Sequence, residues 1–432
     1  MKKNVNDITW LKLDNAALIY PSTLSRKYAC MFRLTITLNE DIDKDVLNEA
    51  LNNVLKRFPT FNFELKQGFF WCYLNKINMP PVIDKDYNNP MLRINFDKNN
   101  KYMFRVRTFK NRIALELFHA LCDGHTALSF LLTLTCEYLK IKYNIKPKYT
   151  DLILNPNDKT DPSEIEDAFL KVTSKEGALV HENKAYHIKG TIEEAHLLNI
   201  ITGVLNVHDV KKLAKKYNAT ITEFIVSLLI LSIQELRKDK HHKSNKDIKV
   251  SIPVNLRRIY NINTQRNFSS YVNVSIDNKK NYSLEEIISI IKDELNVLLS
   301  EKAINAKISA NVKLMKNQFI RRVPMFIKKH IMSFVEAKMG DGYITTNFSN
   351  LGMVSVPKCM EEYITDMNII LGRSRGKSTS VTSISYKDNM YITFSRNIKE
   401  SEFERIFFTK LVELGIDVYI ESNRWYYEMQ KM

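Results

Sequence analysis

Apolar residues recur at every second position between Arg112 and Phe118, which is the period of a β-strand. From His125 onward the spacing changes to the three- and four-residue intervals of an α-helix. One helix face would then carry Leu128, Leu131, Leu132, Thr135 and Leu139. A strand therefore ends and a helix begins within the stretch 119–124. His119 stands at that junction.

The same patterns predict strands and helices on both sides of the junction. Toward the N-terminus we expect strands over 10–17 and 28–38, a helix over 45–56, a hairpin over 61–74 and a strand over 102–109. Toward the C-terminus we expect helices over 210–217, 220–237, 283–302 and from 401 onward, and strands over 249–254, 366–371, 379–385 and 390–395. A Ser or Thr followed three residues later by Glu predicts capping boxes at Thr220, Ser283 and Ser401.

A polar segment over 141–190 interrupts this periodicity, and three prolines punctuate it at Pro147, Pro156 and Pro162. A chain of 432 residues also exceeds what one hydrophobic core usually serves. We therefore predict an α/β protein with an N-terminal half over 1–190, including the connecting segment, and a C-terminal half over 191–432.

Two further segments have unusual composition. The stretch 238–247 is charged and contains His241 and His242, and with no third ligand nearby we interpret it as a solvated loop. The stretch 314–339 mixes apolar and basic residues around Pro324. It could be a membrane-surface helix or a packed helix pair that lines a substrate channel, and its position before 344–352 favours the second reading.

Composition excludes several classes of protein. No apolar run reaches the length of a membrane span, and the start of the chain lacks the apolar core of a secretory signal, so we expect a cytoplasmic protein without a transmembrane segment. The five cysteines are odd in number and contain no Cys-x-x-Cys pair, which indicates reduced thiols and argues against a zinc site.

The formal charge of +16 raises the question of nucleic acid. The lysines are scattered along the chain, however, and no nucleic-acid motif is present, so we expect no nucleic-acid partner. A mild attraction to an anionic donor such as coenzyme A or an acyl carrier protein fits the charge better.

His119 is the candidate for chemistry. An imidazole near its ordinary pKa of about 6.5 can take a proton from a hydroxyl or an amine at neutral pH. A following helix N-terminus disfavours imidazolium and keeps the base form populated. By spacing alone, a lone histidine at a strand end is more often structural, and Asp123 before Gly124 is an ordinary N-cap.

The sequence His119-x-x-x-Asp123-Gly124 resembles the second half of the HHxxxDG motif of the chloramphenicol acetyltransferase-like superfamily, which includes condensation domains, alcohol acetyltransferases and plant BAHD acyltransferases. Four further stretches, 10–16, 251–258, 266–271 and 346–352, also resemble sequences of this superfamily. They are most similar to stand-alone bacterial members of the alcohol-acetyltransferase type. The first His of the motif is Phe118 here, whereas in the family the second His is the catalytic one.

The resemblance implies two halves, each a mixed β-sheet covered by helices, with an active-site tunnel between them. It implies transfer of an acyl group from a thioester to an alcohol or amine, with His119 as general base, no acyl-enzyme, no metal and no permanently bound cofactor. The co-substrate would be acyl-coenzyme A or an acyl-phosphopantetheine carrier, and the other partner a small-molecule acceptor. Asp123 and Gly124 complete the catalytic motif.

The resemblance also suggests supporting residues. Arginine offers a bidentate fork to a carboxylate, so one of Arg257 and Arg258 could hold Asp123 across the halves, and the family favours Arg257. Ser349 and Asn350 are candidates for the oxyanion or substrate site by position.

Three alternatives remain, and a fourth is rejected. The chain could be a non-catalytic binding protein of the same fold, with Phe118 as a sign of decay, or a stand-alone condensation enzyme that forms amides with partners in trans. Cys122 could pair with His119 as a nucleophile, although adjacent turn residues rarely face each other. The stretch 372–378 superficially resembles a phosphate-binding loop. Only three residues separate its glycines, whereas that motif has four, so we reject a nucleotide site.

Overall fold

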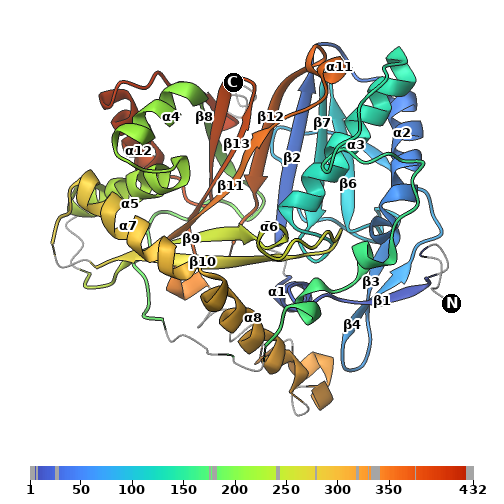
Figure 1. The fold of residues 1–432 in the computed structure, drawn as a ribbon, viewed down its shortest axis with the longest axis horizontal. Helices are drawn as coiled ribbons and strands as arrows, with labels where there is room; N and C mark the ends of the chain where they lie inside the picture. The colour runs from blue at the N-terminus through green and yellow to red at the C-terminus, as the bar shows by residue number, and fades with distance from the viewer. Residues whose placement is uncertain are drawn as a thin grey trace.

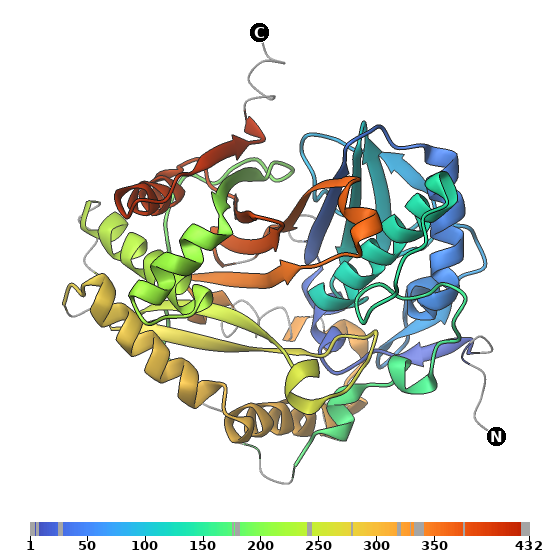
Figure 2. The ribbon, with the colours of Figure 1, turned by 45° about the horizontal axis from the view of Figure 1, so that its top comes forward.

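The computed structural model describes residues 5, 8–24, 29–174, 177, 182–239, 244–277, 280–317, 321–328, 330–331, 341–374 and 376–424. Figures 1 and 2 show two lobes side by side, one formed mainly by the first part of the chain in blue and cyan, the other mainly by the green, yellow and red parts. Each lobe has its own hydrophobic core.

The first lobe is built on a five-stranded sheet with the strand order β12-β2-β7-β6-β5. Its strands are β2 (Met31–Leu38), β5 (Ile83–Lys85), β6 (Phe104–Phe109), β7 (Arg112–Phe118) and β12 (Ile364–Leu371). All neighbours are antiparallel except β5 and β6. The strand predicted to end at the histidine is therefore a central strand.

Two helices pack against each other on this sheet, α2 (Lys44–Arg57) and α3 (Gly124–Tyr143), beside the short α1 (Tyr20–Thr23). Asp43 caps α2 by accepting hydrogen bonds from the N–H groups of Asp45 and Val46. The helix α3 is buried from Thr126 to Leu139, which explains why its apolar positions extend beyond a single stripe. Asn144 ends it in the left-handed conformation, with φ 52°.

The second lobe holds a seven-stranded sheet with the order β10-β9-β11-β13-β14-β8-β15. Its strands are β8 (Asn199–Asn206), β9 (Ile248–Asn255), β10 (Ser269–Ile276), β11 (Thr346–Val354), β13 (Thr379–Tyr386), β14 (Asn389–Arg396) and β15 (Tyr419–Ser422). Because β11 runs parallel to both β9 and β13 while the other pairs are antiparallel, the sheet is mixed.

The remaining helices belong largely to this lobe: α4 (Val207–Lys216), α5 (Ile221–Asp239), α6 (Arg257–Tyr260), α7 (Leu284–Leu298), α8 (Glu301–Lys316), α11 (Lys358–Glu361) and α12 (Glu402–Glu413). Capping boxes are confirmed at Thr220 and Ser283. The one expected at Ser401 is wrong, because Ser401 precedes α12 without a side-chain capping bond. The helix expected over 283–302 is two helices, broken after Leu298.

One strand of the C-terminal half lies in the sheet of the first lobe. Strand β12 belongs by sequence to the C-terminal half, yet it pairs antiparallel with β2 in the sheet of the first lobe. Its outward side chains also bond to the second sheet, where Asn368 donates to Thr202 Oγ1 (3.2 Å) and accepts from Thr393 Oγ1 (2.8 Å). The two lobes are therefore joined through β12.

The connecting segment also binds both lobes. Glu164 forms an ion pair with Arg57 at the end of α2 (2.9 Å) and accepts a hydrogen bond from Gln265 Nε2 of the second lobe (2.8 Å). Near it lies a small antiparallel sheet of β1 (Trp10–Lys12), β4 (Cys72–Lys76) and β3 (Phe63–Gln67).

Two of the expected segments fall partly outside the described residues. His241 and His242 lie outside them, as do 332–339 of the basic segment. The described residues 325–328 are helical and pack on the turn between β3 and β4, where Met325 N–H donates to Phe69 O (2.7 Å) and Lys328 Nζ to Phe70 O (2.9 Å).

No single helix among the described residues has the length and apolar character to span a membrane. The pair α4 and α5, bent by 80°, meets those two criteria only when taken together.

Candidate active site

His119 lies where β7 ends, and the sheet fixes its backbone. Phe118, the last residue of β7, pairs with Met31 of β2, and the next N–H along, that of His119, donates to the carbonyl of Cys30 (2.9 Å). The chain then turns sharply, because the N–H of Leu121 donates back to the Phe118 carbonyl (2.9 Å). The turn leads directly into α3.

Aromatic side chains hold the imidazole ring. Tyr20 of α1 stacks on it with 4.7 Å between ring centroids and 16° between planes, and Phe32 of β2 packs at 4.9 Å. The ring is partly exposed, and its Nδ1 is buried without a hydrogen bond to another residue. Nε2 is therefore the nitrogen that remains to meet a substrate.

The protonation of this ring follows from its surroundings. Burial disfavours the charged imidazolium and lowers the pKa of His119 below its usual value, while its own backbone carbonyl, Asp123 and Asn267 act in the opposite direction. Since burial prevails, the ring is neutral near pH 7. A neutral imidazole with an accessible nitrogen can accept a proton.

Asp123 caps α3 and faces the second lobe. Its Oδ1 accepts from Thr126 N–H (3.1 Å), and its Oδ2 accepts from Arg257 Nη1 (2.7 Å) and Phe268 N–H (2.8 Å). Burial would raise the pKa of Asp123, but Arg257 and the two N–H donors hold it below its usual value. Both carboxylate oxygens are engaged away from the imidazole.

Arg257 is the member of the arginine pair that reaches across, since Arg258 is exposed. Its remaining N–H groups also have partners: Nε and Nη2 donate to Thr264 O, and Nη2 donates to Thr126 Oγ1 and Arg266 O. This buried guanidinium ties the loop 264–268 to the first turn of α3.

Gly124 lies where α3 meets β11. A Cβ atom at this position would approach Leu351 Cδ2 to 3.3 Å, so the missing side chain allows β11 to pass close to the helix start. The structure therefore brings His119, Asp123, Gly124, Arg257 and the strand that carries Ser349 and Asn350 to one place between the lobes.

The comparison with known families decides the affiliation of this chain. Residues 163–387, more than half of the sequence, match the family described as alcohol acetyltransferase. The chain belongs to this family. It is therefore an acyltransferase, as the motifs predicted. No curated protein matches the sequence.

Solved structures show that this acyltransferase shares its two-lobed fold with acetyltransferases and condensation domains. Polyketide synthase associated protein 5 from Mycobacterium tuberculosis is 14% identical with a TM-score of 0.62, over 93% of this chain and 96% of that one. TRI101 of F. graminearum, complexed with coenzyme A and deoxynivalenol, is 9% identical with a TM-score of 0.62, over 96% and 100%. The condensation domain of the Monacolin K polyketide synthase MokA is 9% identical with a TM-score of 0.58, over 94% and 96%.

Phe118, where the motif has its first His, is a core residue in this acyltransferase. It is 1% exposed and packs edge-on against Tyr20 (6.5 Å between centroids) and beside Phe96 (5.8 Å). A phenyl ring therefore fills the position with apolar contacts and supports the same tyrosine that stacks on His119.

Cys122 is unsuited to act as a nucleophile in this acyltransferase. The side chain is fully buried, and burial raises the pKa of its thiol well above the usual value. The thiolate is the reactive form of cysteine, so this environment suppresses it.

The two oxyanion candidates differ in their surroundings. Both are partly buried on β11. The Asn350 amide is already engaged, because Nδ2 donates to Thr222 Oγ1 (3.3 Å) and Oδ1 accepts from Gly352 N–H (2.8 Å) where Gly352 adopts a φ of 77°. Asn350 thus shapes the bulge of β11.

Sequence reasoning assigned no role to three residues at this site, Tyr20, Asp14 and Asn267. Asp14 is 1% exposed, and burial raises its pKa to about 6 even though Arg266 lies 3.5 Å away. Asp14 and Asn267 stand in the stretches 10–16 and 266–271, which carried the resemblance. Their place in those stretches was the available signal in the sequence, but nothing local tells which distant residue Asp14 meets.

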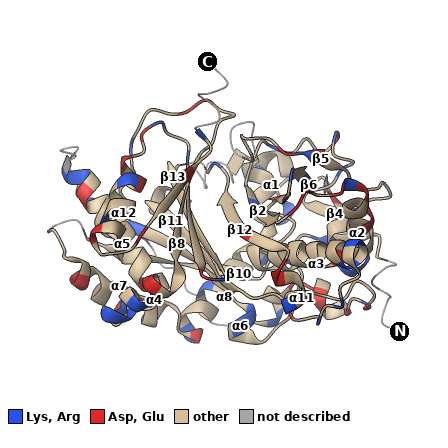
Figure 3. Ribbon diagram, turned by 90° about the horizontal axis from the view of Figure 1, so that it is seen from above, with Lys and Arg blue, Asp and Glu red and all other residues tan. Residues whose placement is uncertain are grey.

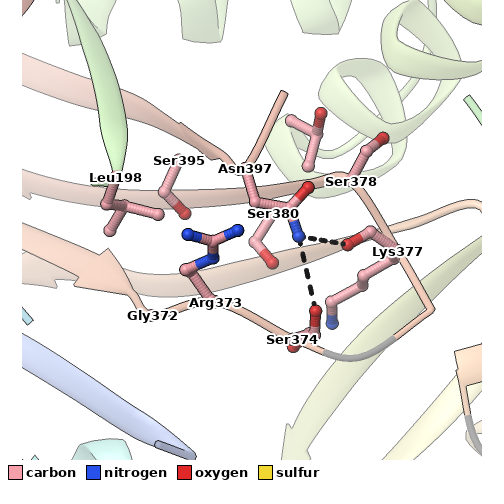
Figure 4. A pocket seen from close by; sticks show the side chains of 10 residues that line it. Leu198, Gly372, Arg373, Ser374, Lys377, Ser378, Ser380, Ser395 and Asn397 are labelled. Atoms are coloured by element: carbon pink, nitrogen blue, oxygen red, sulfur yellow. Dashed lines mark hydrogen bonds between the residues drawn. The ribbon is translucent and has the colours of Figure 1, made fainter. Parts of the chain in front are cut away.

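Residues 372–374, 377 and 378 line part of a small polar cavity of about 10 Å³, the space of one water molecule. Figure 4 shows its side chains, with Asn397 Nδ2 donating to the carbonyls of Ser374 (3.5 Å) and Lys377 (3.4 Å). Arg373 donates to backbone carbonyls, including that of Leu197 (3.2 Å). A cavity of this size has no room for a nucleotide.

Proposed function

We propose that this acyltransferase moves an acyl group from a thioester to an alcohol or an amine, with His119 as the general base. The observation that supports this most directly is the state of the imidazole: it is held by two aromatic rings at a strand end, its Nδ1 is buried, and burial lowers its pKa. A base that is neutral at pH 7 and oriented in advance suits proton removal from an acceptor.

In the proposed reaction, Nε2 of His119 takes the proton from the acceptor hydroxyl or amine as its oxygen or nitrogen attacks the thioester carbonyl carbon. The tetrahedral intermediate then collapses, the carbon–sulfur bond breaks, and the imidazolium returns the proton to the leaving thiolate. The products are an ester or amide and a free thiol. The protein forms no covalent intermediate with the acyl group.

The oxyanion of the intermediate needs hydrogen-bond donors. We assign this role first to Ser349 on β11, because the neighbouring Asn350 amide is committed to Thr222 and Gly352. Gly124 supports the assignment, since it lets this strand approach the start of α3.

For the donor we favour acyl-coenzyme A. TRI101, which shares the fold, has been solved in complex with coenzyme A and deoxynivalenol. Lys and Arg positions are scattered along the ribbon among Asp and Glu positions, as Figure 3 shows. The net charge of +16 attracts an anionic donor without marking a nucleic-acid groove. A carrier-bound acyl group is the second candidate, because condensation domains share the fold.

A thiol-release assay tests the function. The purified protein is supplied with acyl-coenzyme A donors of increasing chain length and with alcohol or amine acceptors, and free thiol is recorded over time. We expect acceptor-dependent release with at least one pair. Products identified by mass spectrometry as amides with no esters would make the protein an amide-forming enzyme.

Two variants control this assay. His119→Ala should show only background release. His208→Ala changes an exposed histidine that pairs with Asp388 on the surface, and should behave as wild type. Ligand binding without turnover by the wild-type protein across coenzyme A and carrier donors would contradict the proposal and favour a non-catalytic binding role.

A further inference from the structure

Behind the imidazole, two polar atoms are buried and lack hydrogen-bond partners: Nδ1 of His119 and Oδ1 of Asn267. Asn267 is 1% exposed, and its side chain lies close enough to the ring to raise the pKa of His119. A buried polar group without a partner costs free energy, so two such atoms on two side chains that interact call for a functional explanation.

Asp14 fixes the orientation of the Asn267 amide. Asn267 Nδ2 donates to Asp14 Oδ2 (3.3 Å), and a carboxylate accepts only from the amide nitrogen. Because the nitrogen and the oxygen diverge from the same amide carbon, the nitrogen occupies the side toward Asp14 and Oδ1 lies on another side. It is the end available to an imidazole N–H.

Asp14 is itself held in place from both lobes. Its Oδ1 accepts from the N–H of Ala17 (2.8 Å), just before α1, and Arg266 Nε lies 3.5 Å from its Oδ2. Arg266 Nη2 in turn donates to the carbonyl of Lys12. The amide of Asn267 thus has a supported position beside the ring.

We propose that Asn267 is a positioning residue: its Oδ1 accepts the hydrogen of His119 Nδ1 and so places the basic lone pair on Nε2, with Asp14 holding the amide in the required orientation. The proposal rests on the proposed function of His119 as the base. It assigns the stretches 10–16 and 266–271 a task in catalysis that is separate from the Asp123–Arg257 pair.

Other charges around the ring act on the same ionisation. Asp123 and Asp14 favour imidazolium, and Arg257 and Arg266 lie against those carboxylates from the second lobe. Tyr20 and Cys122, whose pKa values burial raises, stay neutral near pH 7. The uncharged acceptors beside the ring are the backbone carbonyl of His119 and the amide of Asn267, and of these two Asn267 is the one that a side-chain substitution can remove.

The test is ¹⁵N NMR of the full-length protein labelled at its nine histidines, because ring nitrogen shifts report tautomer and pKa without any substrate. His119→Ala identifies the His119 signals. We expect the wild-type ring to carry its hydrogen on Nδ1. In Asn267→Ala the share of the Nε2–H tautomer should rise and the pKa of His119 should fall, since an acceptor that favours imidazolium is lost.

Asn267→Asp should shift the pKa of His119 in the opposite direction. A carboxylate at this position should raise that pKa above the wild-type value. The matched control is Asn99→Ala, another buried asparagine, which loses hydrogen bonds to Tyr102 O (2.9 Å) and Phe104 O (2.7 Å). It should leave the His119 signals unchanged. In turnover assays, Asn267→Ala should lower kcat with little change in KM.

A wild-type ring protonated on Nε2 would overturn the proposal, as would an Asn267→Ala protein in which both tautomer and pKa are unchanged. Failure of the proposed function would give a different result, because His119→Ala would then retain turnover. The NMR measurement tests the role of Asn267 separately, since it does not depend on activity.

Discussion

At the scale of residues, two residues of one motif have different roles: we propose His119 as the base, and Asp123 holds the surrounding structure. The His119 ring packs between Tyr20 and Phe32 at the end of β7, while the two carboxylate oxygens of Asp123 accept hydrogen bonds from Thr126, Arg257 and Phe268. The sequence predicted both residues and the scaffold role of Asp123, because the motif is local. Asp14 and Asn267 could not be assigned, because they lie more than 250 positions apart and meet only after the lobes pack.

Asp123→Ala should lower both melting temperature and activity. Removing one partner of a buried ion pair leaves Arg257 with an uncompensated charge, at a cost of roughly 3 to 5 kcal/mol. Asp123→Asn should be milder, since the amide oxygen still accepts a hydrogen bond. Thermal unfolding monitored by circular dichroism measures the loss, with Asp97→Ala, which breaks an exposed pair with Lys101, as the control. An unchanged melting temperature in Asp123→Ala would show that the pair contributes nothing to stability.

Cys122→Ala should remain active, because the buried thiol is kept protonated and plays no part in acyl transfer. Alkylating reagents applied to the native protein should leave Cys122 unmodified, as peptide mass mapping can check. A Cys122→Ala protein as inactive as His119→Ala would instead revive the nucleophile alternative.

At the scale of elements, periodicity predicted where strands and helices lie, and local chemistry predicted most of their ends. Strand β7 and helix α3 appear where the apolar spacing changes from two to three or four residues. The capping pattern succeeded at Ser283 and failed at Ser401, although both sequences have Glu three residues later. Whether such a serine caps depends on its backbone: Ser283 is extended, whereas Ser401 has φ −113° and ψ 13°.

This difference makes a direct prediction. Ser283→Ala should cost about 1 kcal/mol of stability, the usual value of an N-cap, because it removes the bond to Glu286 N–H (3.2 Å). Ser401→Ala should be nearly neutral. Urea unfolding of the two variants side by side measures the difference, and an equal loss in both would mean that the capping bond itself is not what stabilises α7.

The approach of β11 to α3 gives a second prediction at this scale. Gly124→Val should push the two elements apart and lower kcat/KM, because even a single Cβ would meet Leu351 at 3.3 Å. Gly124→Ala should be mild, since the atom it meets is the end of a flexible side chain. Leu351→Ala should rescue part of the loss in Gly124→Val. A fully active Gly124→Val protein would show that close approach of β11 is not required.

At the scale of the whole molecule, the two halves expected from length are present as lobes, yet they exchange structure. Strand β12 completes the sheet of the first lobe, and Glu164 of the connecting segment binds Arg57 on one side and Gln265 on the other. Pairing between β12 and β2 joins residues more than 300 positions apart, and no local pattern specifies such a partner. Periodicity alone therefore predicted the strand but not its sheet.

A fragment of residues 1–190 should consequently fail to fold by itself. Without β12, strand β2 becomes an open edge whose side chains are nearly all buried in the intact protein. Size-exclusion chromatography and circular dichroism of the expressed fragment should show aggregation or loss of native structure. A monomeric fragment with native-like spectra would mean that the first half is an independent domain.

The central claim is that neutral His119 removes the acceptor proton, and the pH dependence of kcat/KM tests it most directly. In the wild type, activity should rise with pH through a single ionisation below the usual histidine value of about 6.5, because burial lowers the pKa of His119 and only the unprotonated ring is a base. His119→Ala should lose that limb together with a factor on the order of 10² to 10⁴ in rate. A wild-type limb above pH 6.5, or a His119→Ala protein that keeps more than about a tenth of the wild-type rate, would contradict the claim.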